Sequence, residues 1–331
     1  MKIYQKKMKA AYMNGYGNPD VLSVEEISKP TPVAGQILVK IIASTVTRAD
    51  TMMLTGKPYI GRLFLGLLKP KNSIPGTGYA GVVEAIGEDV KDFNIGDEVF
   101  GETTTSMGAN ADFILVADDS LILNRPLGLS FEEVATLGDG WVTSYNFLKE
   151  IAQIKPGQRI LINGASGSLG TAAVQLAKYF DAHVTGVCST KNLKLIESLG
   201  ADEVIDYTST NFCAEGKKYD ILFDTVGKSS FRQAKHVLSD DGLYMSPVLS
   251  FRLLLESLRT SRTSGRRARF SATGMRTKIE LRTFFQQLLE IHQSKGLKII
   301  IDKRFRLDNI AMAYHYVSTG KKVGNVVIVN E

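Results

Sequence analysis

A glycine-rich turn between an apolar strand and an amphipathic helix is the feature that most constrains how this chain can fold. Residues 159–163 read Arg-Ile-Leu-Ile-Asn, and residues 164–170 continue Gly-Ala-Ser-Gly-Ser-Leu-Gly. The next apolar residues recur at helical spacing: Leu169, Ala173, Leu176 and Phe180. A strand, a glycine-rich turn and a helix in this order predict a βα unit whose free N–H groups, at the start of the helix, bind the phosphates of a dinucleotide.

The three glycines of this turn have separate expected roles. Gly164 and Gly167 let the backbone pass close to a pyrophosphate, and Gly170 lets the helix pack closely on the strand. An ordinary strand-to-helix turn is the alternative, but the βα units that follow in register favour a binding loop. We expect this loop to comprise Gly164, Ala165, Ser166, Gly167, Ser168, Leu169 and Gly170.

The hydrophobic pattern changes once along the chain, and this change predicts two domains. Up to Arg125, short β-like runs are broken by turns, whereas from Pro126 apolar strands alternate with helix-like segments. We therefore expect an α/β, Rossmann-type doubly wound parallel sheet over residues 126–275. Residues 1–125 form the other domain, and residues 276–331 are a tail that can pack back on it. In this tail, residues 277–294 and 308–319 predict helices, and residues 325–329 predict a closing strand.

Composition narrows the class of protein. Of the 331 residues 44% are hydrophobic, which excludes a disordered chain. The two cysteines, Cys188 and Cys213, are too few for a disulfide framework or a four-thiolate zinc site. No run approaches the roughly 18 apolar residues of a membrane span, and the start of the chain lacks an apolar signal region. We expect a cytoplasmic protein.

The residues after the second strand of the α/β domain favour NADPH over NADH. An acidic side chain at this place would bind the adenosine ribose, whereas hydroxyl and cationic groups suit a 2′-phosphate. The chain has no acid there, because Cys188 is followed by Ser189, Thr190, Lys191 and Asn192. A role for Ser189 as the cap of the next helix is compatible with this interpretation.

The motifs together resemble those of the medium-chain dehydrogenase/reductase superfamily, in its zinc-free quinone oxidoreductase (zeta-crystallin-like) group. The resemblance rests on residues 8–12, 75–83, 96–101, 157–178, 198–207, 223–227 and 324–328. It implies a chaperonin-ten-like (GroES-like) β-barrel domain built from both ends of the chain, a central Rossmann domain, and a nicotinamide site between them. It also implies a homodimer.

The same resemblance assigns further cofactor positions. Thr143 corresponds to a threonine near the phosphates, and Tyr207 to a tyrosine beside the adenosine 2′-phosphate. Val226 and Gly227, with residues 245–248, match the rim around the nicotinamide, and Asn325 occupies a position near that ring. Packing in the core or in a turn is the alternative role for Thr143 and Tyr207.

A catalytic zinc is not expected. The zinc-dependent alcohol dehydrogenases of the superfamily have metal ligands at the positions of Thr47, Thr77 and Asp139. None of these is a cysteine or a histidine, and Gly78 replaces an acid of the same motif. A catalytic zinc needs three good ligands, so the resemblance implies chemistry without a metal.

Three residues of the first domain are candidates for the catalytic site. Thr47 lies in the segment that corresponds to the substrate-side motif of quinone reductases, and it can hydrogen-bond a carboxamide or a substrate carbonyl. Tyr59 is the nearest phenol that could donate a proton. Asp50 belongs to the same motif, with a structural role in orienting the loop as its alternative. Met52 stands where the group usually has a tyrosine.

These residues predict an NADPH-dependent oxidoreductase that transfers hydride to a quinone or an α,β-unsaturated carbonyl. Conjugation spreads the developing negative charge, so hydrogen bonds can stabilise it without a metal. A zinc-free alcohol or ketone dehydrogenase is the alternative among enzymes. A cofactor-binding sensor or a nucleic-acid-binding protein without turnover is the alternative outside them. We expect a small electrophilic substrate and no nucleic acid as partner.

The net charge of +6 is concentrated in one segment, residues 251–270, where six arginines face a single acid, Glu256. We expect a solvated loop and short helix, and the alternative is a mobile flap that favours acidic or CoA-linked acceptors. Apolar anchors are expected at Phe251, Leu253, Leu254, Leu255 and Leu258.

Overall fold

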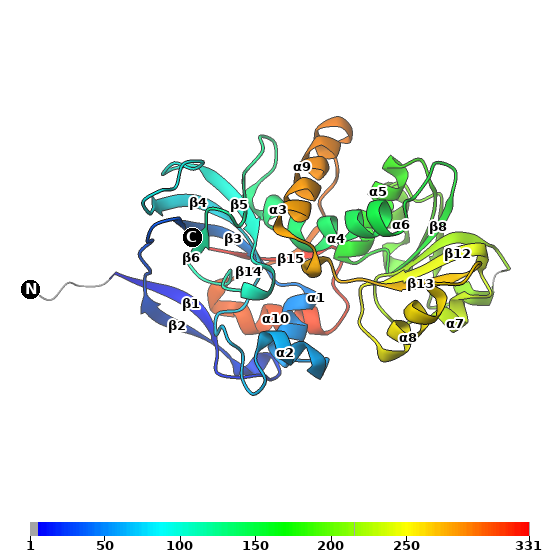
Figure 1. Ribbon diagram of the computed structural model, residues 1–331, viewed down its shortest axis with the longest axis horizontal. Helices are drawn as coiled ribbons and strands as arrows, with labels where there is room; N and C mark the ends of the chain where they lie inside the picture. The colour runs from blue at the N-terminus through cyan, green and yellow to red at the C-terminus, as the bar shows by residue number, and fades with distance from the viewer. Residues whose placement is uncertain (1–5, 215, 331) are drawn as a thin grey trace, which may run out of the picture. The chain divides into compact units, whose positions relative to one another are not determined.

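The computed structural model describes residues 6–214 and 216–330 (Figure 1). It divides into two compact units: a first unit of Met1–Asp139 with Ile301–Glu331, and a second unit of Gly140–Ile300. Among the described residues, no helix combines the length and the hydropathy that crossing a bilayer requires.

The second unit is built on a six-stranded sheet in the order β10-β9-β8-β11-β12-β13, and every neighbouring pair of strands is parallel. The strands are β8 (Arg159–Asn163), β9 (His183–Cys188), β10 (Glu203–Asp206), β11 (Tyr219–Asp224), β12 (Leu238–Ser246) and β13 (Arg267–Phe270). The chain winds outward from β8 in one direction and from β11 in the other. This is the doubly wound Rossmann order, which places ligands at the carboxyl ends of the two central strands.

Helices cover both faces of this sheet (Figure 1). The helices of this unit are α4 (Val142–Tyr145), α5 (Ser168–Tyr179), α6 (Leu193–Ser198), α7 (Phe231–Ala234), α8 (Phe251–Thr260) and α9 (Lys278–Lys295). Right-handed crossovers that leave the sheet centre in opposite directions put α5 and α6 on one face, and α7 and α8 on the other. Ile160, Leu161 and Ile162 of β8 are fully buried between these layers.

The first unit contains a seven-stranded sheet in the order β14-β15-β3-β4-β5-β7, with β6 also paired to β3, and a separate antiparallel pair of β1 and β2. The strands are β1 (Lys7–Met13), β2 (Leu22–Ser28), β3 (Gln36–Thr45), β4 (Gly78–Ile86), β5 (Glu98–Glu102), β6 (Phe113–Ala117), β7 (Leu121–Asn124), β14 (Ile301–Arg306) and β15 (Asn325–Val329). The helices are α1 (Arg48–Thr55), α2 (Arg62–Leu65), α3 (Phe131–Ala135) and α10 (Ile310–Ser318).

The end of the chain completes the first unit. β15 pairs antiparallel with β3, and β14 pairs parallel with β15. Ile310, Tyr314 and Val317 of α10 are buried in one cluster with residues of β1, α1 and β15. The two helices and the closing strand predicted for the tail are therefore confirmed as α9, α10 and β15.

The boundaries of the two units differ from the expected domain limits. Residues 126–139 lie with the first unit and residues 276–300 with the second. Helix α9 explains the second difference, because the Tyr145 ring contacts the Phe284 ring and the Tyr145 hydroxyl donates to Gln287. Helix α3 explains the first, because it packs against β3, β4 and β5.

Candidate functional site

The glycine-rich turn has the geometry of a backbone cradle at the carboxyl end of β8. Gly164 has a positive φ of 81°, and a Cβ there would lie 2.2 Å from Val226 Cγ2. A Cβ on Gly170 would lie 2.2 Å from the Gly164 carbonyl oxygen, so only glycine lets α5 pack this closely on the loop. Gly167 is the N-cap of α5 and has no side chain to bond the N–H groups of the first turn. These N–H groups are suited to bind an anion.

The loop is fixed by the neighbouring strand. The N–H groups of Gly164 and Ala165 both donate to the carbonyl of Val187, at 3.1 and 2.9 Å. Gly167 N–H donates back to the Gly164 carbonyl at 3.1 Å, which closes the turn. Ala165 is fully buried, whereas Ser166 and Gly167 are partly exposed. The cradle is therefore held by β9 and opens along its Ser166 and Gly167 side.

Asp224 organises the loop that leaves β11, beside this cradle. Its carboxylate is fully buried and accepts hydrogen bonds from the backbone N–H groups of Val226, Gly227 and Ser229. The Tyr244 hydroxyl also donates to it, at 3.0 Å, as does the amide of Asn163. Sequence reasoning quoted Asp224 only as part of a motif and missed this role. An acid that directly follows a buried strand was the available signal.

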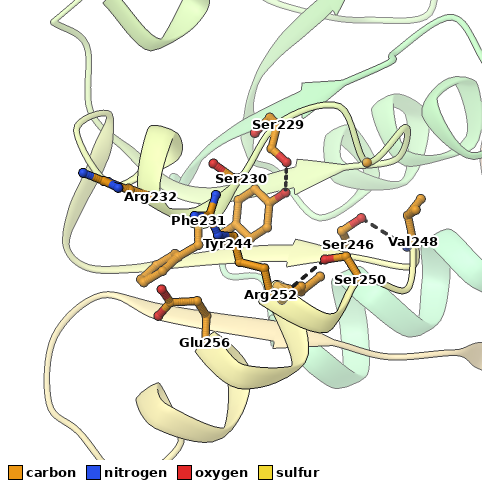
Figure 2. Close-up of a pocket in the computed structure, with 12 residues that line it drawn as sticks. Ser229, Ser230, Phe231, Arg232, Tyr244, Ser246, Val248, Ser250, Arg252 and Glu256 are labelled. Atoms are coloured by element: carbon orange, nitrogen blue, oxygen red, sulfur yellow. Dashed lines mark hydrogen bonds between the residues drawn. The ribbon is translucent and has the colours of Figure 1, made fainter.

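Gly227, a residue of the predicted nicotinamide rim, lines a small cavity between α7 and α8. Gly227 and Val248 line it together with Tyr244, Ser229 and Glu256, and its volume is about 50 Å³. Figure 2 shows the Tyr244 ring at its centre, with the hydroxyl bonded to Ser229. A cavity of ~150 Å³ accommodates benzene, so this space is too small for an aromatic ring.

The end of β9 presents the predicted polar segment. Ser189 is partly exposed, and Thr190 and Lys191 are exposed. Asn192 is buried and its amide donates to Ser189 Oγ at 3.4 Å, so it supports the segment from inside. Ser189 is the N-cap of a short 3₁₀ turn but makes no side-chain capping bond there. The Ser189 hydroxyl therefore does not cap the helix, which was the additional role considered for it.

An acid from the third strand reaches the same place. Asp206, at the end of β10, accepts a hydrogen bond from the Thr190 hydroxyl and others from the N–H and hydroxyl of Thr208. The Thr190 bond, followed by those from Thr208, lowers the pKa of this carboxyl. Sequence reasoning considered only the second strand and missed Asp206. The Thr190 hydroxyl is occupied by its bond to Asp206. Ser189 and Lys191 are therefore the residues of this segment whose side chains can face a ligand.

The remaining predicted cofactor residues of the second unit lie near these two places. The backbone N–H of Tyr207 donates to Cys188 O at 3.1 Å, and the Tyr207 side chain is 59% exposed. Thr143 lies on α4, whose Ser144 hydroxyl donates to the Leu169 carbonyl in the first turn of α5. Asn325, in contrast, begins β15 of the first unit and is 6% exposed.

In the first unit, Thr47 and Asp50 form one hydrogen-bonded pair. The Thr47 hydroxyl and backbone N–H each donate to Asp50 Oδ2 at 2.7 Å, and Asp50 N–H donates to Thr47 Oγ1 at 3.1 Å. This is a capping box at the start of α1. Both side chains are buried, at 5% and 1% exposure. The orienting role considered for Asp50 is compatible with this geometry, and the same contacts give it a hydroxyl to which it can pass a proton.

Two acids of this unit, the buried Asp50 and the half-buried Glu102, have raised pKa values. Burial raises the pKa of Asp50 to about 7, although its bonds from Thr47 oppose the rise. Burial likewise raises the pKa of Glu102 to about 8, and the charges of Asp50 and Asp139 raise it further. The Thr77 hydroxyl lowers both values. Sequence reasoning missed Glu102, because its burial depends on how β5 pairs with β4.

Lys322 is a half-buried lysine that shares Asp139 as a charged neighbour with Asp50 and Glu102. Burial lowers the pKa of Lys322, and the charges of Asp139 and Asp302 oppose that change. The Lys322 ammonium donates to the Gly324 carbonyl at 2.6 Å, one residue before β15. Within residues 6–214 and 216–330, no three His, Cys, Asp or Glu side chains are grouped as metal ligands are.

Among the described residues, no hydrogen bond joins Tyr59 to Thr47 or Asp50. Its side chain is 65% exposed, and its ring lies 4.9 Å from the Arg62 guanidinium. A role as proton donor stays a prediction.

The arginine-rich segment is held to its own unit. Arg266 pairs with Asp240 at 2.7 Å, Arg269 donates to the carbonyls of Ala268 and Ser257, and Arg259 pairs with Glu256 at 3.0 Å. The loop and short helix predicted there are confirmed as α8. The predicted apolar anchors are wrong in part, because Leu253 is buried whereas Phe251, Leu255 and Leu258 are 76%, 51% and 72% exposed. A ten-residue helix on the face of a sheet buries only the stripe at Leu253.

Comparison with known proteins places both units in one family. Residues 33–145 match the profile described as alcohol dehydrogenase GroES-like domain, and residues 199–328 match that described as zinc-binding dehydrogenase. The chloroplastic quinone-oxidoreductase QR1 of Triphysaria versicolor is 31% identical over 335 residues, 98% of each chain. The chloroplastic NADPH-dependent alkenal/one oxidoreductase of Arabidopsis thaliana is 29% identical over 335 residues, 98% of this chain and 80% of that one.

A solved structure agrees. The quinone oxidoreductase from Coxiella burnetii superposes with a TM-score of 0.85 at 26% identity, over 98% of this chain and 100% of that one. The GroES-like and Rossmann folds predicted from the sequence are thereby confirmed. The chain belongs to the medium-chain dehydrogenase/reductase superfamily, in the group of the quinone oxidoreductases.

Proposed function

We propose that this protein is an NADPH-dependent reductase that transfers hydride to a quinone or an α,β-unsaturated carbonyl compound without a catalytic zinc. The observation that carries the proposal is the backbone cradle at residues 164–170, between the two central strands of a doubly wound sheet. Relatives named as quinone and alkenal/one oxidoreductases support the reaction class.

The cofactor fits the chain's own donors. The N–H groups at the start of α5 would hold the pyrophosphate, and Gly167, the N-cap of this helix, presents no side chain to it. Ser189, Lys191 and Tyr207 would hold the adenosine 2′-phosphate, since all three side chains are at least partly exposed around the end of β9. When bound, the nicotinamide supplies the hydride.

The Thr47–Asp50 pair supplies the proton in this proposal. When Asp50 is protonated, it can donate to Thr47 Oγ1, and the Thr47 hydroxyl is then free to donate to a developing oxyanion. When Asp50 is ionised, it holds the Thr47 hydroxyl for itself. Positions Thr47, Thr77 and Asp139 offer one carboxylate and two hydroxyls, a poor set for zinc, so the proposed chemistry depends on hydrogen bonds alone.

The proposed activity has a direct test. NADPH oxidation is measured with purified protein against quinones, enones and enoyl thioesters, before and after dialysis against a chelator. We expect turnover with at least one of the three classes, and the same rate after chelation. Absence of turnover with all three would overturn the proposed reaction. A rate that is lost on chelation and restored by zinc would overturn the zinc-free mechanism.

Ser189→Asp is expected to weaken NADPH binding more than tenfold relative to NADH. A carboxylate at this position repels the 2′-phosphate and can accept hydrogen bonds from the unphosphorylated ribose. The ratio of the two dissociation constants, measured by cofactor fluorescence, is the readout. Ser198→Asp adds the same charge at the far end of α6 and should leave the ratio unchanged. An equal ratio in wild type and Ser189→Asp would show that the 2′-phosphate is bound elsewhere.

A further inference from the structure

Residues 57–71, here called the apolar segment, expose a dense group of large hydrophobic side chains. They are Tyr59 (65% exposed), Ile60 (55%), Leu63 (63%), Phe64 (71%), Leu67 (66%) and Leu68 (93%). Single exposed hydrophobic residues are ordinary on protein surfaces, whereas a contiguous group marks an interaction site. This group spans a short 3₁₀ turn, Tyr59–Gly61, and the helix α2 that follows it directly.

The exposed side chains of the apolar segment point away from the unit, and together they are called the apolar face. Tyr59 and Ile60 lie in the 3₁₀ turn, Leu63 and Phe64 lie on α2, and Leu67 and Leu68 follow the end of α2 at Leu65. Arg62 lies on the other face and turns inward: its Nε donates to the Gly56 carbonyl at 3.1 Å, and its guanidinium lies 4.3 Å from the centre of the Tyr16 ring. A surface helix normally buries its apolar stripe and exposes its charge. Here the arrangement is reversed.

The reversed orientation is fixed by several contacts. The Tyr16 hydroxyl donates to the Gly66 carbonyl at 2.6 Å, and Lys71 N–H donates to the Leu65 carbonyl at 2.8 Å. A Cβ at Gly66, which has a φ of 125°, would lie 2.1 Å from the Lys69 carbonyl oxygen. The apolar face is therefore displayed by a folded segment.

Positive charge flanks the apolar face at both ends. Lys57 precedes it, Lys69 and Lys71 follow it, and all three side chains are exposed. No Asp or Glu occurs between Asp50 and Glu84. Lysines at the border of an apolar surface can lay their stems along it and direct their ammonium groups to anionic headgroups.

We propose that the apolar segment docks the protein on the surface of an anionic phospholipid membrane. The apolar face enters the boundary between headgroups and acyl chains, and the three lysines bind the headgroup phosphates. A second copy of the chain fits this surface poorly, because a two-fold contact would place Lys57, Lys69 and Lys71 against the same lysines of the other copy.

Vesicle sedimentation tests the proposal. Full-length protein is mixed with phosphatidylcholine vesicles, or with vesicles in which a third of the lipid is phosphatidylglycerol. We expect binding to the anionic vesicles only, and weaker binding as salt is raised. The double variant Phe64→Ser with Leu68→Ser removes apolar contact. The triple variant Lys57→Gln, Lys69→Gln, Lys71→Gln removes charge. The triple variant should bind at least tenfold more weakly, because it loses three cations that attract anionic headgroups. The double variant should bind at least tenfold more weakly, because it loses apolar area that enters the membrane boundary.

A matched control comes from the other exposed basic segment. Leu258→Ser with Arg262→Gln changes one exposed apolar residue of α8 and one exposed cationic residue of the turn after it, and should leave vesicle binding unchanged. Circular dichroism confirms that each variant is folded. Equal binding to both lipid compositions, or equal loss in the α8 control, would overturn the proposal. Loss of a dimer in the Phe64→Ser, Leu68→Ser variant, without vesicle binding by the wild type, would overturn it in favour of a second copy.

Discussion

Gly170→Ala is expected to destabilise the second unit by about 3 kcal/mol or more, although alanine is the better helix former by ~1 kcal/mol. The added Cβ would lie 2.2 Å from the Gly164 carbonyl oxygen and 2.5 Å from the Ala165 carbonyl carbon. Both are backbone atoms of a loop fixed to β9, so neither can move without breaking the bonds to the Val187 carbonyl. The steric cost therefore outweighs the helix propensity.

The single tryptophan gives a readout for this unit alone. Trp141 lies in the second unit and is 2% exposed, so its fluorescence changes when that unit unfolds. Urea titrations of wild type and Gly170→Ala should show a large decrease in the transition midpoint. NADPH binding should weaken in the same variant, because the displaced loop contains the anion-binding N–H groups.

Gly167→Ala is the matched control on the same loop. Gly167 has an ordinary φ of −78°, and the nearest atom to its added Cβ is 3.6 Å away. We expect its midpoint to stay close to that of the wild type. If Gly170→Ala unfolded at the same urea concentration as Gly167→Ala, the close approach of α5 to the loop would not be a requirement of the fold.

The sequence predicted the second unit well because its signals are local. The strand at residues 159–163, the glycine turn and the helix after it are adjacent in the chain, and their periodicity shows which residues are buried. The closing strand at residues 325–329 was also predicted within its bounds. That β15 pairs with β3 is a non-local fact, and only the family resemblance indicated that the end of the chain completes the first domain.

The acids of the candidate site show what the sequence could not predict. Asp206 reaches Thr190 because β10 and β9 are neighbours in the sheet, although the two residues are far apart in the chain. The pKa of Glu102 is raised because β5 places its carboxyl beside Gly78 and Gly138. A Cβ on either glycine would approach Glu102 Oε2. Burial of a charged residue depends on such pairings and leaves no local pattern.

Asp50 and Glu102 should make the first unit less stable as pH rises, because folding raises the pKa of both. Folding raises the pKa of Asp50 from 3.8 to about 7 and that of Glu102 from 4.5 to about 8. Between these values the folded state binds more protons than the unfolded state. The stabilisation is therefore complete below about pH 4 and is lost as pH rises through 7 and 8.

Glu102→Gln removes one of these acids while keeping an oxygen for the bond from Thr104 N–H. We expect the variant to resemble the wild type near pH 5 and to be more stable than it near pH 9, where the wild type must bury a charge. Urea unfolding followed by circular dichroism across this range measures the difference. Glu88→Gln neutralises an exposed acid of the same unit and should follow the wild-type curve. A Glu102→Gln curve parallel to that of the wild type would mean that folding does not raise the pKa of Glu102.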